Sequence, residues 1–159
     1  MLNPLLLHEL VHLLLTFLAI SITWLYFLRK KDRHISKYIS VIILGGLLGG
    51  VFLDGDHLFD YLYSFGFIFR PDYFFGGYMF AVSNKVFVPL HAWELVIIFG
   101  VICYMTKNKM AKYFLIALTL GMITHLLFDN YANHAVFFGY SFIFRLFTDF
   151  DAATFSTVY

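Results

Sequence analysis

The sequence predicts an all-α integral membrane protein with about four transmembrane helices arranged as two hairpins. Composition is the first reason, because 61% of the residues are hydrophobic and only 13% are charged, whereas a soluble domain carries about 25% charged residues. The second reason is a set of four apolar stretches close to the length of about 20 residues that a helix needs to cross a bilayer. The third is that basic residues fill two of the connections between these stretches. The length suits a single membrane-embedded helical domain over residues 1–159.

The four apolar stretches are the expected transmembrane helices, and they run Leu5–Leu28, Tyr38–Leu53, Val86–Met105 and Lys112–Phe128. The second and fourth are short by themselves, but both extend through polar residues that a helical bundle would bury. The first is followed, not preceded, by basic residues, so it does not look like a cleavable signal peptide. Each pair of stretches is joined by a short connection, which predicts two helical hairpins.

Basic residues predict the orientation of these helices. The connection between the first two stretches contains Arg29, Lys30, Lys31, Arg33 and Lys37, and the connection between the last two contains Lys107, Lys109 and Lys112. The positive-inside rule places both connections in the cytoplasm. We therefore expect a multi-pass protein of the cell (inner or cytoplasmic) membrane, with both termini and the long central connection on the outer side.

The remaining segments are expected to lie at the membrane surface. Leu58–Phe80, between the second and third stretches, contains eleven Phe and Tyr in 23 residues, and aromatic residues favour membrane interfaces. It is predicted to be an interfacial or re-entrant segment, and Ala135–Phe147 a short C-terminal interfacial segment. The pairs Gly45-Gly46 and Gly49-Gly50 would let a neighbouring helix pack closely.

Charge and cysteine content exclude several classes of function. The net charge is +1, so no global positive field favours nucleic acid as a partner. Cys103 is the only cysteine, which rules out an intramolecular disulfide framework and any multi-cysteine metal site. Membrane lipids are the expected partners.

Ionisable residues gather near the outer ends of the four predicted helices and indicate a shared metal site. Estimated from the helical rise, the His and Asp residues of all four helices lie at one level, about 20–25 Å from the basic connections. These residues could simply snorkel to the membrane interface or form hydrogen bonds between helices. A cation is the economical alternative, because it neutralises several carboxylates and binds neutral imidazoles together. The candidate ligands are His12, Asp54, Asp56, His57, His91, Glu94, His125, Asp129 and His134.

Spacing and ligand type narrow the choice of metal. His125 and Asp129 are four residues apart, and Asp54 and His57 are three apart, so each pair can face one point on a helix. His and carboxylate ligands without thiolate suit zinc, with manganese or iron also possible. At least one ion is expected, and because nine candidate ligands exceed the four of one tetrahedral ion, the number of ligands favours two or more.

The order of these elements resembles a known family. The series is His12 in VHLLLTF, then LDGDH at Leu53–His57, PLHAWEL at Pro89–Leu95 and THLLFDNYANH at Thr124–His134. It is similar to the bacterial and archaeal membrane-bound metal-dependent hydrolases, distant relatives of zinc-dependent phospholipases C and fungal zinc nucleases. The resemblance implies metal ligands at His12, Asp54, Asp56, His57, His91, His125 and Asp129.

The chain departs from the pattern of this family at two places. Leu53 stands where the family often has Pro. The third element reads H-A-W-E, which puts Glu94 near the expected second His and raises the negative charge of the site. His134, five residues after Asp129, is similar to a further His of the zinc phospholipases.

The family implies metal-assisted hydrolysis, in which activated water attacks a lipid or headgroup phosphoester at the outer face. Glu94, Glu9 or Asp56 would take the proton. Two alternatives stay open. His8–His12 reads HELVH, a zinc-protease motif with Glu9 as the base, and Leu53–Gly55 spells the LDG of intramembrane proteases, although neither explains His91, His125 or Asp129. The other alternative is a metal-binding or structural membrane protein without activity.

Overall fold

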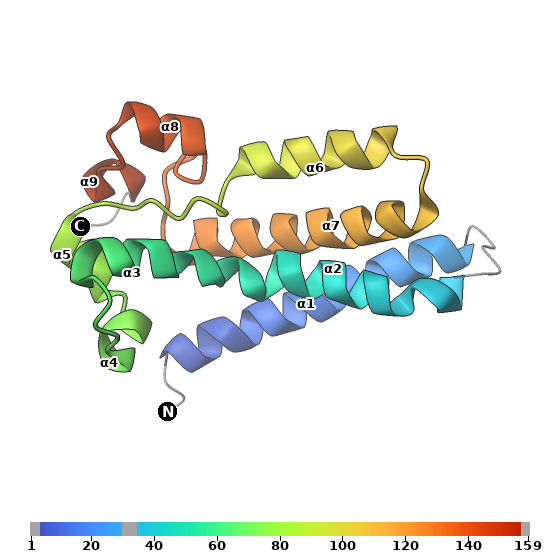
Figure 1. Cartoon of the computed structure of the whole chain (residues 1–159), viewed down its shortest axis with the longest axis horizontal. Coiled ribbons are helices and arrows are strands. Elements are labelled where there is room, and N and C mark those ends of the chain that lie inside the picture. The colour runs from blue at the N-terminus through green and yellow to red at the C-terminus, as the bar shows by residue number, and fades with distance from the viewer. Residues whose placement is uncertain (1–3, 30–34, 157–159) are drawn as a thin grey trace. The chain divides into compact units, whose positions relative to one another are not determined.

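The computed structural model describes residues 4–29 and 35–156, and every regular element in these ranges is a helix (Figure 1). This confirms the predicted all-α class. Two isolated β-bridges, Lys85 with Asp151 and Ala135 with Ser156, add local ties. The helices, in chain order, are α1 (Pro4–Arg29), η1 (Ile35–Tyr38), α2 (Ile39–Gly50), η2 (Phe52–Asp56), α3 (His57–Phe65), α4 (Pro71–Phe75), α5 (Tyr78–Ser83), α6 (Trp93–Met105), α7 (Lys109–Ala132), α8 (Phe142–Phe147) and α9 (Ala152–Phe155).

The chain divides into two compact units, which are described one at a time below. Unit 1 comprises Met1–Leu53 and Leu95–His125, and unit 2 comprises Asp54–Glu94 and Leu126–Tyr159. Helix α7 is continuous through the boundary, so it belongs to both units. The expectation of a single domain stays a prediction.

Two described helices, not four, are long and apolar enough to cross a membrane. They are Leu7–Arg29 within α1 and Lys109–Ala132, and a third span is possible only if Ser36–Gly50 and Phe52–Phe65, bent by 54°, count as one. The predicted span Val86–Met105 is helical only from Trp93, and its 13 helical residues rise about 20 Å, less than the about 30 Å of a bilayer core. Hydropathy counts apolar residues whether or not they lie on one helix, which is why four spans were expected.

Close packing around α2 organises unit 1. A Cβ atom on Gly49 would clash with the backbone carbonyl of Leu118 on α7, and one on Gly50 would clash with the Thr16 side chain on α1. The pair Gly45-Gly46 approaches the same two helices in the same way. The predicted role of these glycines is confirmed. The core beside them contains Ile20, Phe27, Ile42, Tyr113 and Ala117.

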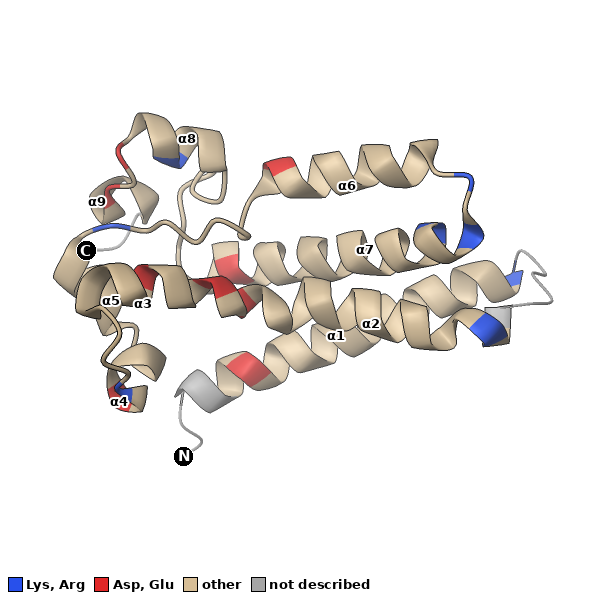
Figure 2. Cartoon of the chain, viewed as in Figure 1, with Lys and Arg blue, Asp and Glu red and all other residues tan. Residues whose placement is uncertain are grey.

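The basic residues of unit 1 gather at one end (Figure 2). Arg29 ends α1, Lys37 lies in η1, and Lys107 and Lys109 lie where α6 gives way to α7. Lys30, Lys31 and Arg33 lie outside the described residues. The basic connections that predict orientation are therefore at one end of unit 1, while the orientation itself stays a prediction.

Unit 2 is built from short helices and an extended segment. The predicted aromatic segment forms α3, α4 and α5, whose rings pack on one another; the Tyr61 ring, for example, lies 5.1–5.7 Å from those of Phe65, Phe69 and Phe74. An extended stretch leads from Asn84 toward α6, and α8 and α9 follow the end of α7. The predicted C-terminal segment Ala135–Phe147 ends in α8. The placement of either segment at a membrane interface stays a prediction.

Candidate metal centre

Two buried aspartates hold the extended segment that delivers His91. Asp60 accepts hydrogen bonds from the N–H groups of Phe87, at 2.7 Å, and Val88, at 3.0 Å. Asp56 accepts from the two N–H groups that follow Pro89, at 2.6 and 3.2 Å. This segment forms no helix, and buried backbone N–H groups need partners. The two carboxylates provide them and so fix the path of the chain.

Arg145 supports the same segment from its carbonyl side. Its guanidinium donates to the carbonyl oxygens of Val88, at 3.1 Å, and His91, at 2.9 Å, and the side chain is 1% exposed. Val88 has a φ of +28°, which is unusual for a β-branched residue and strains the backbone. Its N–H and carbonyl are both held by charged side chains, which explains why this conformation persists.

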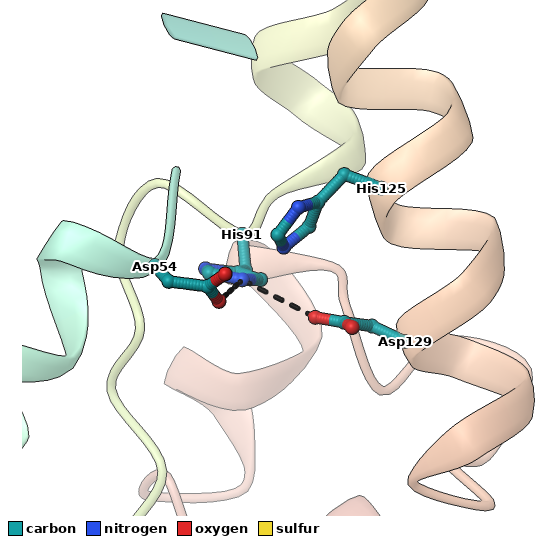
Figure 3. A group of neighbouring side chains, drawn as sticks. All are labelled: Asp54, His91, His125 and Asp129. Carbon is teal, nitrogen blue, oxygen red and sulfur yellow. Dashed lines mark ion pairs between the residues drawn. The ribbon is translucent and has the colours of Figure 1, made fainter. Parts of the chain in front are cut away.

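His91 lies at the centre of three carboxylates. Its Nε2 lies 3.3 Å from Oδ1 of Asp54 and 3.3 Å from Oδ2 of Asp129 (Figure 3). Its Nδ1 lies 3.0 Å from Oδ1 of Asp56. The imidazole is fully buried, and Asp56 and Asp129 are almost so. Burial by itself lowers the pKa of His91, but Asp129, Asp54 and Asp56 outweigh it and raise that pKa well above its ordinary value.

His57 adds a second imidazole to this cluster. Its Nε2 lies 3.2 Å from the same Asp54 oxygen that faces His91, and the two imidazole rings stack at 5.2 Å. Asp56, His57 and His91 also offer one ligand atom each within 4.8 Å of one another. Unit 2 thus brings together Asp54, Asp56, His57, His91 and Asp129, as the sequence predicts. Buried His and Asp residues here could hold a metal ion.

Two distances in this cluster match the separation of neighbouring ligands on a metal ion. Ligands about 2.0–2.1 Å from zinc lie about 3.3 Å apart, and both carboxylate oxygens are 3.3 Å from Nε2 of His91. Metal-binding imidazoles usually donate their other N–H to a carboxylate or a carbonyl. Asp56 is in position to accept that bond from Nδ1 of His91.

Unit 1 contains a row of three imidazoles of its own. Nδ1 of His125 lies 2.5 Å from the carbonyl oxygen of Gly50, and its ring stacks on that of His12 at 3.8 Å. Nε2 of His12 lies 2.9 Å from Nε2 of His8. His8 and His12 occupy one face of α1, and His8 is a predicted ligand only in the protease alternative.

His125 and Asp129 are four residues apart on the continuous helix α7, so they share a face (Figure 3). His125 ends unit 1, whereas Asp129 belongs to unit 2. The expectation that His12 and His125 complete the cluster of unit 2 stays a prediction.

Three predicted site residues have other surroundings. Glu94 accepts hydrogen bonds from the Ser141 hydroxyl and from the N–H groups of Phe142 and Ile143, at the start of α8. Glu9 is exposed on α1, and His134 is exposed beyond the end of α7. None of the three belongs to a metal-binding group that includes Asp54 or His91 among the described residues. Their predicted roles as base or ligand stay untested.

Asp60 and Arg145 are the residues that the sequence analysis did not assign to the site. The position of Asp60 could have indicated its place in the site, because it lies one helical turn beyond Asp56 and three residues beyond His57. No sequence pattern indicates Arg145, because the carbonyls of Val88 and His91 that it contacts at the site lie more than 50 residues away in the chain.

Comparison of the chain with known protein families, curated proteins and solved structures finds no match. The resemblance to membrane-bound metal-dependent hydrolases therefore stays a prediction.

Proposed function

We propose that the protein is a membrane-embedded metal-dependent hydrolase that cleaves a phosphoester in a lipid or lipid headgroup. One observation carries this proposal. Nε2 of His91 faces one oxygen each of Asp54 and Asp129 at 3.3 Å, while Asp56 lies at hydrogen-bond distance from Nδ1. This arrangement has the ligand types and the separation of a zinc site.

Electrostatics supports a cation at this position. Asp54, Asp56 and Asp129 bring three carboxylates to two imidazoles, those of His57 and His91. Even with both imidazoles protonated, one negative charge remains, and an uncompensated charge is costly in a buried site. Arg145 and Asp60 add one positive and one negative formal charge beside the cluster and so leave this balance unchanged, and the described hydrogen bonds of Arg145 go to backbone carbonyls. A divalent ion would neutralise the cluster.

The proposed ligands are Asp54, His91 and Asp129, with His125 as a further ligand through its place one turn before Asp129 on α7. One observation supports this role: Nδ1 of His125 lies at hydrogen-bond distance from a backbone carbonyl, the kind of partner that usually orients a metal-binding imidazole. His12 stays a candidate ligand from the family resemblance, and Asp56, His57 and His91 form a second group within unit 2 that could hold an ion. Zinc suits this mixture of imidazole and carboxylate, and manganese or iron are alternatives.

The residues of the chain would bind and orient the phosphoester and move one proton. A bound ion supplies activated water and polarises the phosphoryl oxygen. Asp56 is the candidate base that lies in the cluster, through its Oδ1, because its Oδ2 accepts backbone N–H groups; Glu94 has both carboxylate oxygens engaged at α8. The preference for a lipid phosphoester rests on the family resemblance and on the candidate membrane-spanning helices. The outer face is proposed from the basic connections.

Turnover of a lipid phosphoester by purified protein tests this function. The wild type should release the headgroup or phosphate from a short-chain phospholipid in mixed micelles, and Asp54→Asn should lose this activity. Asp72→Asn is the matched control, because Asp72 is 61% exposed on α4 and pairs with Arg70. Activity that survives in Asp54→Asn would contradict the proposed site. A wild type that holds metal without any turnover would favour the non-enzymatic alternative.

An intramembrane metalloprotease is the second candidate, and one observation favours it. The Nε2 atoms of His8 and His12 lie 2.9 Å apart on one face of α1, as two ligands of an HELVH motif would. This candidate leaves the His91 cluster without a function, so we rank it second.

A further inference from the structure

We infer that the connection between α3 and α4 inserts into the membrane interface. Its apolar tip consists of Phe67, Ile68 and Phe69, whose exposed fractions are 95%, 75% and 54%. Three consecutive large apolar side chains in water are unfavourable, and such a patch marks an interaction surface. This inference concerns a lipid contact and does not depend on the proposed hydrolase activity.

The tip is a built feature and not a loose loop. Gly66 turns the chain out of α3 with φ +65° and ψ −149°, a conformation that suits glycine. Buried Tyr61 then fixes the connection: its hydroxyl donates to the carbonyl of Ile68, at 2.8 Å, and accepts from the N–H of Arg70, at 2.7 Å. Buried Tyr61 therefore holds the apolar tip in its exposed position.

The residues beside the tip match a lipid headgroup region. Arg70 stacks on Tyr73, with the guanidinium 3.8 Å from the ring centroid, and pairs with Asp72 at 3.0 Å. Tyrosine and a partly exposed arginine are typical of the level where hydrocarbon meets headgroups. The tip thus has hydrocarbon-like side chains at its end and amphipathic ones at its base.

A bilayer explains the tip better than a second copy of the chain. Side chains of this size bury about 150–250 Å² each, so three fall short of the about 800 Å² per partner of a stable interface. The same chain carries two helices apolar enough to span a membrane, which favours lipid as the occupant. Helix α3 separates the tip from His57 by nine residues, or about 13 Å. Insertion would therefore bring the candidate metal centre close to lipid headgroups.

Spin-label accessibility in vesicles tests this inference. Cys103→Ser gives a cysteine-free chain, and single labels are placed through Phe67→Cys, Ile68→Cys or Asn84→Cys. Asn84 is the control, because it is an exposed polar residue at the end of α5 in the same unit. The protein is reconstituted in phosphatidylethanolamine and phosphatidylglycerol vesicles. Positions 67 and 68 should show a higher ratio of oxygen to nickel-chelate accessibility than position 84.

Two results would overturn the inference. Equal ratios at positions 67, 68 and 84 would mean that the tip lies in water. Dipolar broadening at position 67 that disappears on dilution with unlabelled protein would mean that a second copy covers the tip. Because the tip side chains are exposed, these labels should leave the fold intact, which a circular dichroism spectrum would check.

Discussion

Glu94 has both of its carboxylate oxygens engaged at the start of α8. Its partners are the Ser141 hydroxyl and two backbone N–H groups, and hydrogen bonds to a charged group contribute about 1.5–3 kcal/mol each. Glu94→Gln removes the negative charge and places the side-chain NH₂ group, a donor, opposite a group that donates to Glu94 in the wild type. We expect the free energy of unfolding to fall by roughly 1–3 kcal/mol at neutral pH, measured by denaturant titration in detergent. Bound metal should be unchanged; loss of metal would make Glu94 a ligand.

The same substitution has a defined pH dependence. Burial by itself raises the pKa of Glu94, but the hydrogen bond from Ser141 and those from the backbone outweigh it and lower that pKa below its ordinary value of 4.5. A lowered pKa contributes stability above the unfolded-state pKa, and this contribution is lost as the pH falls through the folded-state pKa. The stability difference between wild type and Glu94→Gln should therefore shrink below about pH 4.5. A difference that grows on acidification would contradict this account.

His8 and His12 separate the two enzymatic candidates. In the proposed hydrolase, His12 binds metal and His8 only contacts its imidazole. His12→Ala should then abolish binding of the metal ion that contacts His12. His8→Ala should only weaken the affinity for that ion, by about 10–100-fold, as loss of an orienting partner does. In a protease both are ligands. Zinc titration of the two purified variants decides, and equal losses of affinity would favour the protease.

The identity of the clustered residues is the part of this site that the sequence predicts best. Asp54, Asp56, His57, His91 and Asp129 are all identified from spacing and side-chain type, and the structure brings them together. The sequence does not predict which of these carboxylates would bind an ion and which accept hydrogen bonds from the backbone. Whether a carboxylate faces an ion or a backbone N–H depends on the path of the extended segment.

At the scale of elements, the glycines of α2 fix how three helices of unit 1 pack. Gly49→Ala would place a Cβ against the backbone of Leu118, which cannot rotate away. Overpacking of this kind costs roughly 1–3 kcal/mol. Gly100→Ala on α6 is the matched control, because a Cβ there meets nothing within 4 Å, and it should be neutral or slightly stabilising. Unfolding midpoints in detergent measure both, and equal midpoints would contradict the packing account.

Helix lengths show where sequence reasoning about elements fails. The long helices α1 and α7 and the close packing at the glycine pairs follow from apolar runs and small residues. The third predicted span does not form as one helix, because the segment before Trp93 gives its N–H groups to Asp56 and Asp60. The donor and acceptor residues of those bonds are about 30 residues apart in the sequence, and a hydropathy pattern cannot predict such long-range hydrogen bonds.

At the scale of the whole molecule, charge is divided between the two units. Unit 1 has eight of the eleven Lys and Arg and two of the ten Asp and Glu, whereas unit 2 has three and eight. This division agrees with a basic cytoplasmic side, and it is the basis of the proposed orientation.

Cysteine labelling in intact cells tests that orientation. In the Cys103→Ser background, Lys109→Cys should be protected from a membrane-impermeant thiol reagent, because the basic connection faces the cytoplasm. Asn84→Cys should be labelled. Both residues are exposed, so a failure to react reports sidedness and not burial, and labelling after permeabilisation provides the control. The reverse pattern would place the candidate metal centre on the cytoplasmic side.

The metal content of the purified protein tests the central claim most directly. Mass spectrometry of the digested wild type, loaded with zinc and then dialysed, should find at least one transition metal ion per chain. His91→Gln and Asp129→Asn should lose most of it, because each removes an atom from the cluster around Nε2 of His91. Asp72→Asn, an exposed carboxylate on α4, should retain it. A folded wild type that holds no metal, or one whose metal survives both cluster substitutions, would contradict the account.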